Sequence, residues 1–206
     1  MSFFEKNYFL LRKLQVLTGL LPVGIFLLVH LSINSYALKG PESFNAAAGF
    51  MEQLPFVGFM EIFIIAVPIL FHGLYGLWIV YIARNNTSKY GHYRNWAFYL
   101  QRISALITFV FLVYHVYTTR MAKLLYGTEI NFNLMASELA NPAILGFYIV
   151  GVIASMYHFA NGLWGLLIDM GITIGPRSQK VVTYVTSALF IVLSVLSIQI
   201  LLAFRA

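Results

Sequence analysis

Five long apolar stretches dominate this chain of 206 residues and limit it to folds that a lipid bilayer can surround. A helix needs about 20 consecutive apolar residues to cross the hydrocarbon core of a bilayer. Stretches of that length are predicted at 15–36, 57–82, 99–120, 142–168 and 181–203. Only 10% of the residues are charged, against about 25% in a typical soluble domain. The sequence therefore predicts an all-α integral membrane bundle of five transmembrane helices, forming one domain over residues 1–206.

Basic residues are distributed unevenly between the two sides of this bundle. The side on which the chain begins has nine: Lys6, Arg12, Lys13, Arg84, Lys89, Arg94, Arg102, Arg177 and Lys180. The other side has four: Lys39, Arg120, Lys123 and Arg205. By the positive-inside rule, the N-terminus is expected in the cytoplasm and the C-terminus outside. A basic face also attracts anionic partners; we expect it to dock a cytoplasmic protein and no nucleic acid.

Proline and asparagine mark breaks within and between the apolar stretches. Pro22 predicts a bend in the first helix, and Pro68 predicts a kink in the second. Asn141 followed by Pro142 is typical of a helix start, with the asparagine as N-cap. The residues 43–53 predict a short helix lying on the outer membrane surface.

Four histidines lie inside the apolar stretches, one in each of the first four. His30 and His115 lie about five residues to the outer side of their helix midpoints, and His72 and His158 about two or three residues to the inner side, a separation of roughly 11 Å at the rise of an α-helix. Neutral imidazole is an axial ligand of haem iron. The spacing predicts two haems, one between the first and third helices and one between the second and fourth.

The second and fourth stretches share the motif aromatic-His-x-x-x-Gly-Leu-Trp, at residues 71–78 and 157–164. Gly76 and Gly162 follow their histidines by four residues, on the same helix face, and are expected to leave space for a porphyrin. The other ring nitrogen of each ligand needs an acceptor, for which we expect the carbonyl one turn back on the same helix. The chain has no cysteine, which excludes iron–sulfur clusters, disulfides and covalently attached haem from it.

Simpler roles exist for the same kinds of residue. A buried histidine can be a hydrogen-bonded bundle residue, and a helix glycine can be a small-residue packing contact. Trp78 and Trp164 are expected to be interfacial anchors, and His92, in the basic inner loop, is expected in solvent or at a subunit contact. Glu61, near the outer end of the second stretch, is either an end residue that reaches water or a proton acceptor beside a quinone.

Several motifs spread over the chain carry a family resemblance. They are Leu21-Pro22-Val23-Gly24-Ile25-Phe26 with His30, Arg94-Asn95-Trp96 with Gln101-Arg102, Gly146-Phe147-Tyr148-Ile149-Val150-Gly151-Val152, His158-Phe159 with Asn161-Gly162-Leu163-Trp164, and Gly171-Ile172-Thr173 with Pro176-Arg177-Ser178-Gln179. In these motifs, the sequence from Phe3 through Leu201 resembles the di-haem cytochrome b membrane anchor of bacterial succinate dehydrogenase, in the class with one five-helix anchor subunit. The anchors of fumarate reductases are similar to a lesser degree.

The resemblance implies a function and a set of partners. His72 and His158 would hold the iron of an inner, higher-potential haem b, and His30 and His115 that of an outer, lower-potential haem b. A flavoprotein that oxidises succinate and an iron–sulfur protein would bind the cytoplasmic face. Menaquinone would be reduced near the outer haem. The chain would then be a multi-pass protein of the bacterial cytoplasmic membrane, the quinone-reducing subunit of an enzyme rather than an enzyme alone.

Other functions stay open on the sequence. The same anchor could serve a quinol:fumarate reductase, with electrons moving in the opposite direction. A proton-coupled transporter could use the histidines as a relay, although such relays usually include buried carboxylates and the first, third and fourth stretches have none at histidine depth. A purely structural anchor without cofactors would predict that His30→Ala leaves the absorbance spectrum and the quinone activity intact.

Overall fold

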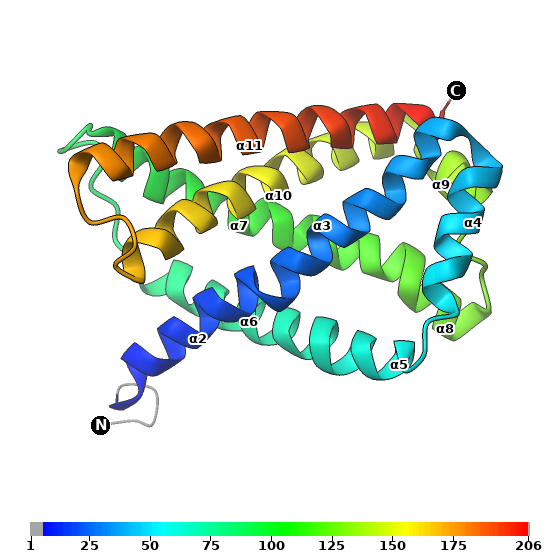
Figure 1. Cartoon of the computed structure of the whole chain (residues 1–206), viewed down its shortest axis with the longest axis horizontal. Helices are drawn as coiled ribbons and strands as arrows, with labels where there is room; N and C mark the ends of the chain where they lie inside the picture. The colour runs from blue at the N-terminus through cyan, green and yellow to red at the C-terminus, as the bar shows by residue number, and fades with distance from the viewer. Residues whose placement is uncertain (1–5, 206) are drawn as a thin grey trace.

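Five helical rods lie side by side in the computed structural model of this chain, which describes residues 6–205 (Figure 1). Phe3, where the family resemblance begins, and the last residue of the predicted domain lie outside the described residues. The rods in this part of the chain are Tyr8–Lys39, Val57–Ile82, Tyr93–Tyr126, Pro142–Asp169 and Pro176–Ala203. All are long and apolar enough to cross a membrane, so the predicted all-α membrane bundle is confirmed.

The two ends of the bundle differ in construction. The end where α2 begins carries the loops 83–92 and 170–175 and is called the N-terminal end here (Figure 1). The opposite end, where α11 finishes, carries additional short helices and is called the C-terminal end (Figure 1). The first, third and fifth rods begin earlier than predicted, at Tyr8, Tyr93 and Pro176. The prediction counted apolar residues only, whereas a helix continues into polar sequence while its backbone bonds stay paired.

The first rod is interrupted at the predicted position. It consists of α2 (Tyr8–Leu20), α3 (Pro22–Asn34) and the 3₁₀ turn η1 (Ser35–Lys39). Leu21 separates α2 from α3, with φ −78° and ψ −73°. Pro22 has no N–H and so ends the hydrogen-bond ladder of α2 while its fixed φ suits the first turn of α3. The predicted break at Pro22 is confirmed.

The second and third rods each contain a π-helical segment near the C-terminal end. The second rod is α5 (Val57–Phe59), the π segment η2 (Met60–Ala66) and α6 (Val67–Ile82). The third is α7 (Tyr93–Val116), the π segment η3 (Tyr117–Met121) and α8 (Ala122–Tyr126). Pro68, for which a kink is predicted, lies two residues after the end of η2, and a π turn is one way in which a helix accommodates a disturbed ladder.

Two short helices close the C-terminal end. α4 (Pro41–Glu52) matches the predicted surface helix, and α9 (Phe132–Leu139) has no counterpart in the prediction. Asn45 of α4 accepts a hydrogen bond from the backbone N–H of Phe132 at 2.8 Å. The rings of Phe44, Phe132 and Phe204 meet with centroids 4.9–6.2 Å apart. These contacts hold α4, α9 and the end of the chain together above the bundle.

The fourth rod is the central helix of the bundle. It is α10 (Pro142–Asp169), which packs against α7 on one side and against α11 (Pro176–Ala203) on the other. Asn141 caps it as predicted, accepting a hydrogen bond from the N–H of Ala143 at 2.9 Å. Gly151 lets α7 approach α10 closely, because a Cβ at this position would overlap the ring of Phe111.

Gly151→Ala tests this close approach. The added methyl group must displace Phe111, and overpacking of this kind costs about 1–3 kcal/mol. Gly146→Ala, on the same helix but with no heavy atom within 4 Å of the added Cβ, should instead gain about 0.5–1 kcal/mol from helix propensity. Thermal unfolding in detergent measures both. Equal midpoints for the two variants would contradict the packing described here.

Candidate functional site

The four histidines of the apolar stretches lie in the bundle core as two facing pairs. His30 on α3 faces His115 on α7, with ring centroids 5.8 Å apart and ring planes at 74°. His72 on α6 faces His158 on α10, with centroids 6.0 Å apart and planes at 79°. The structure thus brings together the same residues that the sequence paired, each pair joining two different rods.

The two pairs are stacked along the length of the bundle. Tyr148 contacts His115 and lies ten residues before His158 on α10, which corresponds to about 15 Å at the rise of an α-helix. The separation of roughly 11 Å predicted between the pairs stays a prediction, since this rise is the one between Tyr148 and His158 on a single helix. The His72–His158 pair lies toward the N-terminal end, and the His30–His115 pair toward the C-terminal end.

Backbone carbonyls of neighbouring helices orient the His72–His158 pair. The Nδ1 atom of His72 lies 2.7 Å from the carbonyl oxygen of Gln15 on α2, and that of His158 lies 3.2 Å from the carbonyl oxygen of Gln101 on α7. The prediction of an acceptor one turn back on the same helix is therefore wrong. These rings extend away from their own helix and reach carbonyl oxygens of the helix that faces them, which can accept a second hydrogen bond through their other lone pair.

The two acceptor sites repeat the same local arrangement. The carbonyl of Gln15 also accepts from the hydroxyl of Thr18 at 3.1 Å, and the carbonyl of Gln101 from that of Ser104 at 3.0 Å. Ser104 lies 3.5 Å from Nδ1 of His158 as well. The motif shared by the second and fourth stretches is thus accompanied by a repeated arrangement on the helices that face them.

Gly76 and Gly162 belong to this repeated arrangement. A Cβ at Gly76 would lie 3.3 Å from Nε2 of Gln15, and a Cβ at Gly162 would lie 3.5 Å from Nε2 of Gln101. Each glycine therefore leaves room for the glutamine whose carbonyl serves the histidine one turn earlier. Their predicted role in clearing space for a porphyrin stays a prediction.

Gln101 also joins α7 to α10 through its side chain. Its amide Nε2 donates to the carbonyl of His158 at 3.0 Å, and its Oε1 accepts from Asn161 at 2.7 Å. Sequence reasoning missed Gln15 and Gln101 as site residues. The available signal was an amide side chain within an apolar helix, which is costly in lipid unless it has a partner.

Side chains rather than carbonyls surround the His30–His115 pair. Nδ1 of His115 lies 3.3 Å from the hydroxyl of Tyr148, a residue that is only 2% exposed. The ring of Phe111 stacks on His115 with centroids 5.7 Å apart, and that of Phe26 lies 5.5 Å from His30. Tyr148 is a third residue that the sequence alone did not single out as part of a site.

The Nε2 atoms of His72, His115 and His158 make no hydrogen bond to any described residue. With Nδ1 engaged as a donor, the neutral tautomer carries a lone pair on Nε2. That tautomer is the one that binds a metal through Nε2. Within residues 6–205, no three His, Cys, Asp or Glu side chains converge in a way that could hold a metal ion.

Glu61 lies at the C-terminal end and is part of an ion pair. Its carboxylate accepts from the guanidinium of Arg120, so the π segments η2 and η3 are joined by this contact. Both side chains are about one-third exposed. Glu61 thus lies near the end of its rod, partly exposed, with its charge compensated by Arg120.

The two tryptophans of the repeated motif have different environments. Trp78 is 48% exposed on the outer surface of α6, as an interfacial anchor requires, whereas Trp164 is 6% exposed. The Nε1–H of Trp164 donates to Thr183 on α11 at 3.0 Å. The prediction that Trp164 is an interfacial anchor is therefore wrong, because α11 covers this face of α10. His92 is exposed at the start of α7, as predicted.

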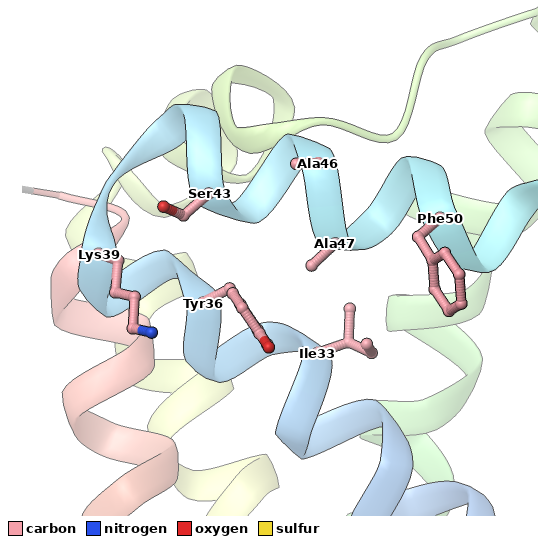
Figure 2. A pocket seen from close by; sticks show the side chains of 7 residues that line it. All are labelled: Ile33, Tyr36, Lys39, Ser43, Ala46, Ala47 and Phe50. Atoms are coloured by element: carbon pink, nitrogen blue, oxygen red, sulfur yellow. The ribbon is translucent and has the colours of Figure 1, made fainter.

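A cavity of about 520 Å³ opens between α3, η1 and α4 at the C-terminal end (Figure 2). It is lined by Ile33, Tyr36, Lys39, Ser43, Ala46, Ala47 and Phe50. The hydroxyl of Tyr36 lies between the two helices in this view (Figure 2). Ile33 follows His30 by three residues on α3, so the cavity lies at the same end as the His30–His115 pair and has the volume of a small-molecule site.

Fold and site together define a membrane helical bundle with two facing imidazole pairs in its core. A family of succinate dehydrogenase/fumarate reductase transmembrane subunits matches residues 82–197. The chain is 48% identical over 196 residues to the succinate dehydrogenase cytochrome b558 subunit of Bacillus subtilis (strain 168). The matched residues make up 95% of this chain and 96% of that protein. The chain belongs to the succinate dehydrogenase/fumarate reductase transmembrane subunit family, as its motifs predict.

Gln101→Leu tests the side-chain link between α7 and α10. The variant removes the bond to the carbonyl of His158 and the bond from Asn161, and hydrogen bonds between membrane helices are worth about 0.6–1.7 kcal/mol each. We expect a loss of about 1–3 kcal/mol in the free energy of unfolding, measured by denaturation in mixed micelles. Gln53→Leu makes the same chemical change at an exposed position and should have almost no effect.

Proposed function

We propose that this chain is the cytochrome b membrane anchor of a succinate:menaquinone oxidoreductase and holds two haems b. The observation that carries the proposal is the pair of facing imidazoles at two levels of the bundle, with centroids 5.8 Å and 6.0 Å apart. Family membership and the cytochrome b558 name of the Bacillus subtilis relative support it. The inner haem would be held by His72 and His158, and the outer haem by His30 and His115.

The residues present fit such a group. Two metal–imidazole bonds of about 2 Å, as known for zinc, together with about 1 Å from each nitrogen to its ring centre, give a centroid spacing of about 6 Å. Both observed spacings agree with this value. Gly19 leaves room for the imidazole of His72, because a Cβ at this position would overlap the ring. His72 therefore rests directly against the backbone of α2.

The protein's own contribution is to fix and isolate these ligands. Hydrogen bonds from Nδ1 to Gln15 and Gln101 set the tautomer of the inner pair and leave Nε2 as the donor to iron. Two histidines would hold the iron of each haem and leave it no free position, which would disfavour oxygen binding and suit electron transfer. When bound, the haems supply one-electron carriers between an iron–sulfur partner and a quinone.

Basic side chains at the N-terminal end support the proposed orientation and partners. Nine of the thirteen Lys and Arg residues belong to this side of the bundle, which the positive-inside rule assigns to the cytoplasm. A flavoprotein and an iron–sulfur subunit would dock there, so that electrons enter at the His72–His158 pair. The chain would lie in the bacterial cytoplasmic membrane as a multi-pass subunit.

Menaquinone reduction would take place at the C-terminal end, near the His30–His115 pair. The cavity between α3 and α4 supports this location, since it is mainly apolar and adds the hydroxyl groups of Tyr36 and Ser43 and the ammonium of Lys39 as donors to a quinone carbonyl (Figure 2). Glu61 is proposed as a proton acceptor at the same end. To act in that role, its carboxylate has to leave the ion pair with Arg120.

Single histidine variants test the ligand assignment. His72→Ala and His115→Ala should each lose one haem, so the b-type absorbance of the dithionite-reduced protein falls to about half of the wild-type value. His92→Ala changes an exposed histidine outside the pairs and should keep the full absorbance.

The alternatives give other results in the same measurement. A colourless wild-type protein would support a histidine relay in a transporter, and an unchanged spectrum in both variants would support a purely structural anchor. Loss of both haems from one variant alone would mean that the pairs are not independent sites.

Electron flow from the N-terminal to the C-terminal end predicts a dependence on membrane potential. Moving one charge through 100 mV is worth about 2.3 kcal/mol, and succinate is a weak reductant for low-potential menaquinone. A protonophore that collapses an outside-positive potential should slow succinate oxidation through menaquinone in intact cells. Electron transfer from succinate to a water-soluble dye at the cytoplasmic face is the control and should not change. Unaltered menaquinone reduction would favour the fumarate-reducing direction.

A further inference from the structure

Glu138 has a buried carboxylate that the proposed electron path does not use. It lies in the last turn of α9, beside Leu139, which has no exposed surface. Both of its carboxylate oxygens are buried, and neither makes a hydrogen bond to a described residue. Burying a carboxylate costs several kcal/mol unless its charge is compensated, so a position of this kind requires an explanation.

The polar groups around Glu138 are tyrosine hydroxyls. Its carboxylate interacts electrostatically with Tyr114 on α7 and with Tyr148 on α10. Tyr148 in turn lies 3.3 Å from Nδ1 of His115. Thr118 also interacts with the hydroxyl of Tyr148. When Nδ1–H of His115 donates to the oxygen of Tyr148, the hydroxyl proton of Tyr148 can point to the carboxylate. Carboxylate, phenol and imidazole therefore form one line toward the outer pair.

The inner pair has no such line. The acceptors of His72 and His158 are the neutral carbonyls of Gln15 and Gln101. The two pairs thus consist of the same residue type at nearly the same ring spacing, but among residues 6–205 an acidic side chain is connected only to the outer pair. Hydrogen-bonded partners of a ligating imidazole tune the electron density that it gives to the metal.

We propose that Glu138 is a positioning residue for the outer haem, acting through Tyr148 on His115 and lowering the reduction potential of that haem. The inference rests on the proposed function. A negative charge in a site of low dielectric stabilises the oxidised, more positive form of the iron, and a polarised phenol increases the donor strength of His115. Glu138 therefore separates the potentials of two haems that otherwise have equivalent ligands.

The test is a redox titration of the reduced absorbance in the complete complex, comparing wild type with Glu138→Gln. We expect the lower-potential haem to be easier to reduce by about tenfold, which is 59 mV for a one-electron couple, while the higher-potential haem moves much less. Tyr148→Phe should shift the same haem in the same direction. The double variant should shift it no further than the larger single change, because both substitutions interrupt one line.

Matched controls separate this role from general charge and packing effects. Glu129→Gln removes the same charge from an exposed position at the same end and should leave both potentials unchanged, and Glu138→Asp should restore most of the wild-type value. Two haems with wild-type potentials in Glu138→Gln would overturn the inference. If that variant fails to assemble, Tyr148→Phe decides alone, since it removes one oxygen atom. A wild-type complex without two haems contradicts the proposed function instead.

Discussion

The hydrocarbon core of a membrane offers no hydrogen bonds, so each imidazole in this bundle depends on the protein for an acceptor. His72 and His158 find theirs on other helices, at Gln15 and Gln101. This requirement fixes which helices stand next to one another and how they are rotated. It also explains the glycines, since a side chain at Gly19, Gly76 or Gly162 would meet either the ring or the glutamine that serves it.

The same requirement is met differently at the two ends of the bundle. Near the N-terminal end, main-chain carbonyls orient the rings, and the arrangement is repeated almost residue for residue between the α2–α6 and α7–α10 helix pairs. Near the C-terminal end, the hydroxyl of Tyr148 is the group next to Nδ1 of His115, and Glu138 of α9 interacts with Tyr148. A repeated scaffold thus carries two facing imidazole pairs with different surroundings.

The sequence predicts much of this fold for a simple reason. Length and apolar composition determine the five spans. Pro22 marks the interruption of the first rod, and Asn141 marks the N-cap of α10. The histidine pairing also follows from the sequence, because depth in a membrane helix is counted in residues.

What the sequence does not predict depends on contacts between helices. The acceptors of His72 and His158 were expected on the same helix, since no local pattern shows that a carbonyl of another rod lies closer. Trp78 and Trp164 occupy equal positions in one motif, yet α11 covers only the second. α9 is eight residues of mixed polarity, too short for a periodic signal, and its burial comes from the residues of α4 and α10 around it.

The π segments η2 and η3 set the rotation of the helix ends that carry Glu61 and Arg120. A π turn holds one residue more than an α turn, and one residue corresponds to about 100° of rotation about the helix axis. Removing a single residue from η2 would let a regular helix form while His72 keeps its place against α2. Everything before the deletion would swing to another face, so the C-terminal end can change its surface chemistry over evolution without disturbing the imidazoles beneath it.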